Sequence, residues 1–405
     1  MKRILVLGGG IGGVEAAISL TKQFKKDKNY EITLISERDF LYIYPITIWI
    51  PVGKRNFEDV TLSIPKIADI HGFKFLKEKV QKIIARENKV ITDKQEHNYD
   101  YVIVALGGTK LRPKGIENTL SICGSPEEAL QIRDRLFELI EKGNGTIAAG
   151  FGGNPKDPTA VRGGPVFEVL FNIDTLLRDK KIRDKFNLIF FSPSAEAGKR
   201  LGESGMKRLQ KLFMDKKIQP VLGKKIKEFQ KDGILFEDDT KIQTDLTLFT
   251  PGLQGNPVLR ESDLPLTEAG FVPIDDYCRA KGFENCYVIG DSAYFEGPDW
   301  RAKQGHIAEV MARASAKNIK LQEEGKEPEE TYKGHLSILC VMDLGRQGVF
   351  VYRNDKKAIA PMGAWAHWAK LAWEKYYKLH KLGKAPTIDI ELWKLYFKNY
   401  KKLIE

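Results

Sequence analysis

Short apolar runs and stretches with helical periodicity alternate along the first half of the chain. Residues 4–7 form the first apolar run, and residues 14–25 then carry apolar side chains at helical spacing. Further apolar runs follow at 31–36, 99–106, 145–149 and 187–192. Runs of this length between amphipathic helices are typical of buried parallel strands. The pattern therefore predicts an α/β fold in which helices cover parallel sheets.

Glycines occupy the turn between the first apolar run and the first predicted helix. Gly8, Gly10 and Gly13 fill the pattern G-x-G-x-x-G, in which the first glycine permits a tight turn and the second lets a pyrophosphate approach the backbone. The third lets helix and strand pack closely, so that the phosphates lie at the N-terminus of the helix. Glu37 follows the second apolar run, where a carboxylate reaches an adenosine ribose. Residues 4–37 are therefore predicted to bind a dinucleotide.

A second, imperfect copy of this unit begins near residue 145. The segment after its apolar run is longer than the first glycine turn, and it carries Arg162 just before a predicted helix that starts near Gly164. The next apolar run, 187–192, ends in Ser-Pro-Ser and has no acid at the ribose position. We therefore predict a second Rossmann-like domain that does not bind NADH tightly.

A late apolar run, 285–289, ends in Gly290 and Asp291. This ending is similar to the second signature of flavoproteins with two dinucleotide-binding domains, where the aspartate holds the ribitol chain of FAD. Paired with the early glycine turn, it predicts FAD as the cofactor. The predicted organisation is an FAD-binding domain at 1–115 and 246–330, a second Rossmann-like domain inserted at 116–245, and a C-terminal region at 331–405.

The stretch from residue 362 to residue 405 differs in composition from the rest of the chain. It carries four of the six tryptophans with lysines spaced between them, and Trp365, Trp368 and Ala372 fall on one face of a predicted helix. Aromatic and lysine side chains on amphipathic helices suit the headgroup layer of a membrane. We therefore expect a peripheral region that binds an anionic membrane surface, with a dimer or interdomain helix pair as the alternative.

The overall composition narrows the classes of protein. The chain is 42% hydrophobic with a formal net charge of +11, which indicates a globular protein with an anionic partner. No apolar run approaches the roughly 18 residues of a membrane span, and no recognition motif favours nucleic acid. The four cysteines are too scattered for a disulfide scaffold, and no C-x-x-C spacing indicates zinc.

With these residues in place, the chain resembles the sulfide:quinone oxidoreductases, relatives of flavocytochrome c sulfide dehydrogenase and type II NADH dehydrogenase. The resemblance includes G-P-V-F-E at 164–168, K-Q-G at 303–305, C-V-M-D-L-G at 340–345 and W-A-H-W-A-K-L-A-W-E-K-Y-Y at 365–377. It implies that FAD accepts two electrons from sulfide, and that a quinone docks at the membrane against Trp373 and Val341. It also implies further FAD contacts from Ile11, Gly12, Arg38, Pro45, Ala105, Gly107, Gly290 and Lys303.

The redox cysteines of that family are only partly matched. Cys340 corresponds to the cysteine that precedes D-x-G, and Cys123 corresponds to an accessory cysteine that in some members joins the flavin. The other essential cysteine should stand just before Gly164, where this chain has Arg162. We expect Cys340 to be the reactive thiol and Arg162 to stabilise its thiolate and attract an anionic donor. Lys303 is expected to stabilise the reduced flavin with its positive charge.

The predicted function is that of an FAD-dependent oxidoreductase at the surface of the cytoplasmic membrane. It would pass two electrons from a small donor, sulfide or polysulfide, to quinone. Two alternatives remain: an NADH:quinone oxidoreductase, and a flavin-bearing subunit that works with a cytochrome partner. The sequence leaves open the membrane face, the formation of a homo-oligomer and a covalent bond between Cys123 and the flavin.

Overall fold

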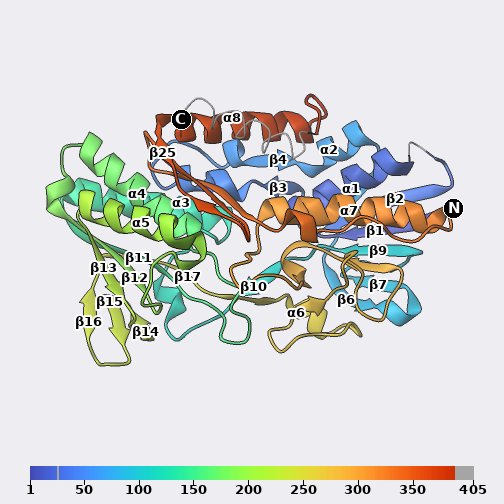
Figure 1. Ribbon diagram of the computed structural model, residues 1–405, viewed down its shortest axis with the longest axis horizontal. Helices are drawn as coiled ribbons and strands as arrows, with labels where there is room; N and C mark the ends of the chain where they lie inside the picture. Colours follow the sequence, from blue (N-terminus) through green and yellow to red (C-terminus); the bar gives the residue numbers. More distant parts are fainter. Residues whose placement is uncertain (25–26, 388–405) are drawn as a thin grey trace.

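The computed structural model describes residues 1–24 and 27–387, which form two sheet-and-helix halves side by side (Figure 1). In the first half, helices α1 (Ile11–Phe24) and α7 (Gly305–Glu323) pack against each other beside a parallel sheet. The strand order of this sheet is β20 (Cys286–Val288), β9 (Tyr101–Val104), β1 (Lys2–Leu7), β2 (Tyr30–Ser36) and β5 (Lys74–Lys77). Because β20 and α7 come late in the chain, this half is assembled from two segments, as predicted for a split FAD domain.

The second half repeats the parallel-sheet plan. Its helices are α3 (Pro126–Lys142), α4 (Gly164–Asp179) and α5 (Gly202–Asp215). Its strand order is β13 (Ile218–Leu222), β12 (Phe186–Ser192), β11 (Gly145–Phe151) and β17 (Leu246–Thr250). Because β17 pairs with β11, the second sheet extends beyond residue 245, where the sequence interpretation ended the inserted domain.

Smaller sheets, strand pairs and short helices complete the fold. Two three-stranded antiparallel sheets are formed by β6 (Val80–Ile84), β7 (Lys89–Thr92) and β8 (Glu96–Asn98), and by β14 (Ile226–Gln230), β15 (Gly233–Phe236) and β16 (Lys241–Gln243). Three strand pairs are β3 (Phe40–Tyr42) with β4 (Thr61–Ser63), β10 (Gly108–Lys110) with β18 (Leu253–Gly255), and β19 (Val272–Pro273) with β21 (Ala293–Tyr294). Short helical segments are η1 (Tyr44–Trp49), α2 (Ile64–His71) and α6 (Pro257–Arg260).

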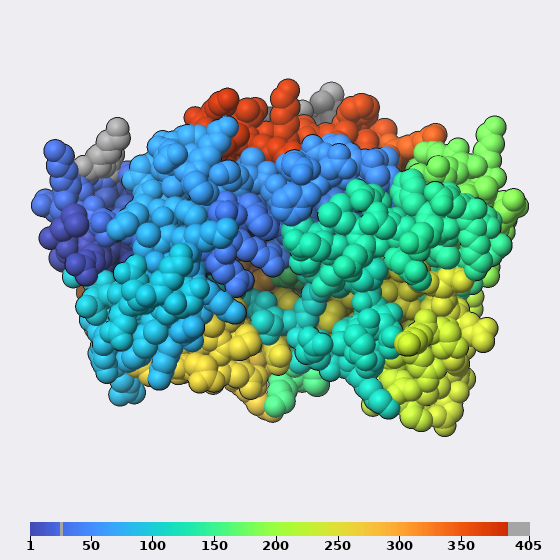
Figure 2. Space-filling model, turned by 180° about the vertical axis from the view of Figure 1, so that it is seen from behind, coloured from blue at the N-terminus to red at the C-terminus, as the bar shows by residue number. Residues whose placement is uncertain are grey.

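The C-terminal region adds an antiparallel sheet and a long helix. The sheet contains β22 (Ile338–Asp343), β23 (Gly348–Arg353), β24 (Ala358–Ile359) and β25 (Met362–Gly363). Helix α8 (Ala364–Lys381) runs along one edge of the molecule above both halves (Figure 1), and the same edge is seen from behind in Figure 2. Among the described helices, none is both long and apolar enough to cross a bilayer. Residues 388–405, including Trp393, lie outside the described residues.

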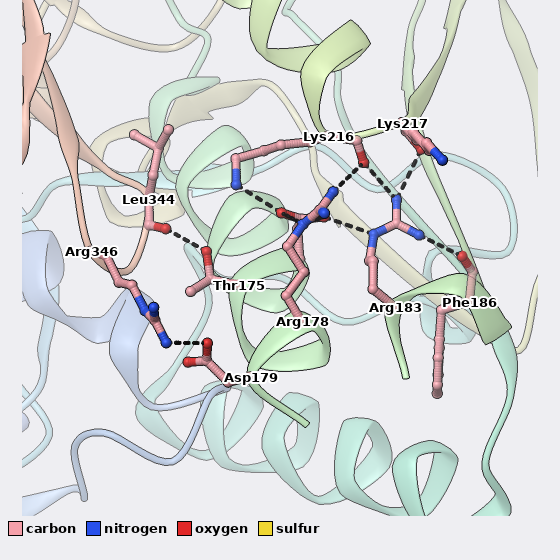
Figure 3. A network of polar contacts seen from close by, with 10 residues as sticks. Thr175, Arg178, Asp179, Arg183, Phe186, Lys216, Lys217, Leu344 and Arg346 are labelled. Carbon is pink, nitrogen blue, oxygen red and sulfur yellow. Dashed lines mark hydrogen bonds and ion pairs between the residues drawn. The ribbon is translucent and has the colours of Figure 1, made fainter. Parts of the chain in front are cut away.

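One polar stripe of α4 fixes the turn that joins β22 to β23 (Figure 3). The Asn172 side chain donates to the Asp343 carbonyl at 3.0 Å, and the Thr175 hydroxyl donates to the Leu344 carbonyl at 2.6 Å. One turn further along, Asp179 pairs with Arg346. Residues three or four apart share one face of a helix, so these contacts hold the hairpin along the axis of α4. The second half thereby sets the position of β22.

Candidate active site

A single cavity of about 2690 Å³ gathers nearly all the predicted site residues. This volume exceeds the ~300–1,000 Å³ of a typical small-ligand pocket, so it can hold a large cofactor together with a substrate. Gly13 is the predicted residue that does not line the cavity. The predicted residues that line it are Gly8, Gly10, Ile11, Gly12, Glu37, Arg38, Pro45, Ala105, Gly107, Cys123, Arg162, Gly290, Asp291, Lys303, Cys340, Val341 and Trp373.

The glycine turn has the shape that a dinucleotide needs. A methyl group on Gly13 would lie 1.8 Å from the Gly8 carbonyl oxygen, so only glycine permits this close packing of α1 on β1. A methyl group on Gly10 would meet no protein atom within 4 Å, so the protein itself does not require glycine there. Gly10 instead borders the open cavity. The turn therefore fits the pyrophosphate of FAD, with Glu37 and Asp291 also lining the space that FAD would occupy.

The corresponding turn of the second half carries a folded loop in place of a compact glycine turn. β11 ends at Phe151 and α4 begins at Gly164, and the loop between them is held by Asn154, whose side chain donates to the Leu253 carbonyl at 2.7 Å. At its end Arg162 forms an ion pair with Asp291 and lies 6.0 Å from the ring centre of Tyr44. The loop thus brings a cation into the part of the cavity that the first half lines with Asp291.

Cys340 and Cys123 are both free thiols that line this cavity, but their surroundings differ. Burial and the Glu168 carboxylate together raise the pKa of Cys340 to about 12, and Lys370 only partly opposes this. Burial also raises the pKa of Cys123, and there Arg162 is the opposing charge. The expectation that Arg162 stabilises a thiolate at Cys340 is therefore wrong, because β22 places Cys340 against α4 and α8 instead.

Behind Cys340, α4 and α8 meet in a buried ion pair that sequence reasoning missed. Glu168 and Lys370 form this pair, and both side chains are nearly inaccessible. Glu168 also accepts a hydrogen bond from the Asp343 backbone N–H at 2.9 Å, and Lys370 donates to the Val341 carbonyl at 3.1 Å. Burial raises the pKa of Glu168, an effect that Lys370 opposes. The pair therefore holds β22 in place just after Cys340.

Asp343 explains why separate motifs of the sequence belong together. Its carboxylate accepts a hydrogen bond from Trp49 Nε1 at 2.7 Å and contacts His367 Nδ1. Its backbone N–H binds Glu168. The motifs at 164–168, 340–345 and 365–377 thus converge on one buried aspartate. The sequence motifs include Glu168, Asp343, His367 and Lys370. The sequence does not show that these four residues lie close together, so it did not identify them as one group.

Lys303 lies one residue before the N-cap of α7, and its side chain is buried in the cavity wall. Its ammonium donates to the Ala293 carbonyl and lies 4.0 Å from the ring centre of Phe271. Burial, reinforced by the charge of Arg162 and opposed by Asp157, lowers the pKa of Lys303 to about 7. The positive charge expected from Lys303 is therefore present below neutral pH and largely lost above it.

Helix α8 presents two different faces. Lys370 and Lys381 are buried, and Lys381 pairs with Glu15 and Glu309. The expectation that the lysines of this helix lie at a membrane surface is therefore wrong for these two, because they neutralise buried carboxylates. The opposite face is open, with Trp368 66% exposed and Ala372 also exposed. Trp365 is half-buried at its edge.

Comparison with known proteins agrees with this geometry. The model of the pyridine nucleotide-disulphide oxidoreductase family matches residues 2–316. The chain belongs to this family. It is 26% identical to the sulfide-quinone reductase of Aquifex aeolicus, over 98% of this chain and 95% of that protein. It is 23% identical to a type II NADH:quinone oxidoreductase of Staphylococcus epidermidis, over 87% of this chain and 90% of that protein.

A solved structure extends the likeness to the whole fold of this pyridine nucleotide-disulphide oxidoreductase. The crystal structure of the sulfide:quinone oxidoreductase from Aquifex aeolicus superposes with a TM-score of 0.84 at 25% identity. The superposition covers 96% of this chain and 94% of that chain. Together with the glycine turn, Glu37 and Asp291, these findings make the protein an FAD-dependent oxidoreductase.

Proposed function

We propose that this FAD-dependent oxidoreductase passes two electrons from sulfide or a polysulfide to quinone at the surface of a membrane. FAD supplies the two-electron carrier when bound. The observation that carries the proposal is that Cys340 on β22 and Trp373 on α8 line the same cavity as the glycine turn. The similarity to a sulfide-quinone reductase along nearly the whole chain supports the same donor and acceptor.

On the donor side, Arg162 would attract the donor and Cys340 would react with it. Hydrosulfide and polysulfide are anions, and the Arg162 guanidinium, which is partly exposed in the cavity, would attract them. Burial keeps the Cys340 side chain in its neutral thiol form, so the thiol must lose its proton when it reacts. Arg162 cannot form a sulfur–sulfur bond, so we expect sulfide turnover that is slow relative to an enzyme with a cysteine at this position.

On the acceptor side, α8 would shape the docking place of the quinone. Trp373 and Tyr377 supply aromatic surface, and Val341 continues it from β22. The exposed side of α8 would rest on the headgroup layer, so that a lipid-soluble quinone enters without crossing water. This arrangement supports the proposal that the protein binds peripherally to the cytoplasmic membrane.

The decisive experiment follows the visible absorbance of the flavin under anaerobic conditions. Sodium sulfide should bleach the oxidised flavin of the purified protein, and a short-chain quinone should restore it. The Cys340→Ser variant should lose sulfide-dependent bleaching, whereas Arg162→Cys should accelerate it. Bleaching by NADH in place of sulfide would transfer the function to the NADH:quinone reaction of the other relatives. Unchanged sulfide oxidation in Cys340→Ser would remove this cysteine from the reaction.

A further inference from the structure

A second group of buried charges lies under the far end of α8, away from Cys340. Lys381 is fully buried and forms ion pairs with Glu15 of α1 and with Glu309 of α7, the latter at 2.7 Å. Arg313 also pairs with Glu15, at 3.1 Å. Burial lowers the pKa of Lys381, but Glu15 and Glu309 outweigh it and raise the net pKa. Burial likewise raises the pKa of Glu15, but Lys381, His380 and Arg313 hold it well below its usual range. Glu15 and Lys381 therefore stay charged.

His380 stands between this cluster and the outside. It lines the main cavity, and it also lines a surface hollow of about 550 Å³ whose wall includes Lys22, His71 and Lys384. Its Nε2 lies 3.8 Å from Glu15 Oε2, and its ring stacks on Tyr376 with centres 5.8 Å apart. His380 thus forms part of the wall between solvent and the cavity.

The inner side of the cluster opens towards the quinone end of the cavity. Glu309 lines the cavity together with Tyr377 and Trp373, and its side chain is 20% exposed. The contacts run from His380 to Glu15, from Glu15 to Lys381 and from Lys381 to Glu309. A continuous series of ionisable groups therefore joins the surface hollow to the acceptor end of the cavity.

We propose that His380 takes up protons at the surface hollow and releases them into the main cavity, which it also lines, for the reduction of the quinone. The charged Glu15–Lys381–Glu309 cluster beside it holds the imidazole in place. This inference rests on the proposed function, because reduction of a quinone adds two electrons and two protons to its two oxygens. The electrons come from the donor by way of the flavin. Reoxidation of the reduced flavin anion releases one proton, so at least one more must be taken up from water. Imidazole is the side chain whose unperturbed pKa lies nearest neutrality, so it can accept a proton from water and release it inward.

The other groups around His380 have distinct parts in this route. Glu15 and Lys381 are fixed charges that keep the hydrogen-bonding groups in register. His71 of α2 contacts the Lys381 carbonyl at 2.9 Å and lines the outer hollow with Lys22 of α1. Arg313 of α7 balances Glu15, and the Tyr376 ring holds the imidazole flat. Glu309, at the inner end, lines the main cavity.

The test separates proton supply from electron donation. The flavin-loaded protein is reduced with dithionite, mixed with decylubiquinone in a stopped-flow instrument, and its flavin reoxidation is followed from pH 5.5 to 9. His380→Phe keeps a ring against Tyr376 but removes the nitrogens, and we expect reoxidation about tenfold slower above pH 7. This is less than the ~10²–10⁴-fold of direct acid–base catalysis, because His380 supplies protons without contacting the quinone. The deficit should shrink at low pH, and the dithionite-reduced spectrum should be unchanged. His97→Phe, on β8 and paired with Glu78, is the matched control and should behave as the parent.

Chemical rescue gives the second readout. Imidazole added to His380→Gly should restore reoxidation by quinone, and Glu309→Gln should slow reoxidation without responding to imidazole. Equal rates and equal pH profiles in His380→Phe and the parent would overturn the proton route. If His380→Phe fails to retain flavin, absence of rescue in His380→Gly overturns it as well. Failure of the parent itself to be reoxidised by quinone would instead refute the proposed function, and this inference with it.

Discussion

The two Rossmann-like halves begin with the same strand–turn–helix plan and use the turn for different purposes. In the first half only a few residues separate β1 from α1, and Gly10 leaves the helix N-terminus open to a pyrophosphate. In the second half the loop from β11 to α4 folds back on the protein and ends with Arg162 paired to Asp291. In a duplicated nucleotide-binding scaffold, one turn can therefore keep its cofactor site while the other turn forms part of the cavity wall.

The helices that follow these turns differ in the same way. α1 buries mainly small and aliphatic residues, and Glu15 is its one strongly buried charge. α4 buries Glu168, Asn172 and Thr175 and uses them to hold the β22–β23 hairpin. The first helix thus serves the cofactor, and the second serves the strand that carries Cys340. α8 ties both together, since Lys381 pairs with Glu15 and Lys370 pairs with Glu168.

The largest difference between the two halves is expected from substitution of a glycine in each turn. Gly10→Leu should yield protein without flavin, because the side chain would fill the open space that the pyrophosphate needs. Gly164→Leu is the matched variant in the second half, where a methyl group also meets no protein atom within 4 Å. It should retain FAD. The ratio of visible to protein absorbance after purification measures both, and full flavin content in Gly10→Leu would refute the assignment.

The next largest effect is expected from the buried pair that joins α4 to α8. Lys370→Met leaves the Glu168 carboxylate buried without its partner, which should lower the free energy of unfolding by about 3–5 kcal/mol. The double variant Lys370→Met/Glu168→Gln removes both charges and should recover most of this loss. Urea unfolding of the flavin-loaded proteins at neutral pH checks both. A double variant no more stable than Lys370→Met would show that the pair itself is not the cause.

The outer face of α8, which belongs to neither half, should bind membranes. Trp368→Ala should weaken sedimentation with anionic vesicles by about tenfold, since burying an aromatic side chain of this size contributes about 1.5–3 kcal/mol. Stability should change little because Trp368 is 66% exposed. Vesicle binding by the parent should also fall as salt rises, because each lysine near an anionic surface adds about 1 kcal/mol. Equal sedimentation of Trp368→Ala and parent would remove α8 from the membrane contact.

The effect of Lys303 on the flavin potential should depend on pH. With a pKa of about 7, its ammonium is present below neutrality and absent above it. Lys303→Met should therefore lower the flavin midpoint potential at pH 6 by a few tens of millivolts, where about 30 mV corresponds to about 1.4 kcal/mol for two electrons. The potentials of variant and parent should converge by pH 9. A difference that persists unchanged at pH 9 would mean that the lysine stays charged.

The smallest effect is expected at the exposed end of the α4 stripe. Arg346→Ala breaks an ion pair with Asp179 whose side chains are 75% and 42% exposed. Surface pairs of this kind contribute about 0–1 kcal/mol, so urea unfolding should shift only slightly. The contrast with Lys370→Met would show that the buried end of α4, and not its whole polar face, holds β22. A large loss of stability in Arg346→Ala would contradict this division.

Local sequence signals predicted what depends on local structure. The apolar run at 4–7, the helical pattern at 14–25 and the glycine turn between them all follow from spacing, and the structure has them in β1, α1 and the turn that joins them. The charge environment of Cys340 was not predictable, because Glu168 and Lys370 lie far from it in sequence and become neighbours only through packing. The burial of Lys381 was missed for the same reason. Helical periodicity predicts which side chains share a face of α8, but it does not predict that carboxylates of other helices pack against that face.

The cavity is walled by residues from Gly8 near the beginning of the chain to Thr387 at the end of the described part. During synthesis, the glycine turn would leave the ribosome long before α8, and the wall of the cavity would be complete only when α8 had packed on Glu15 and Glu168. Cofactor retention is therefore a late event in biogenesis. A ribosome-stalled nascent chain that ends before Ala364 should exchange FAD freely with solution, whereas the released chain should hold it.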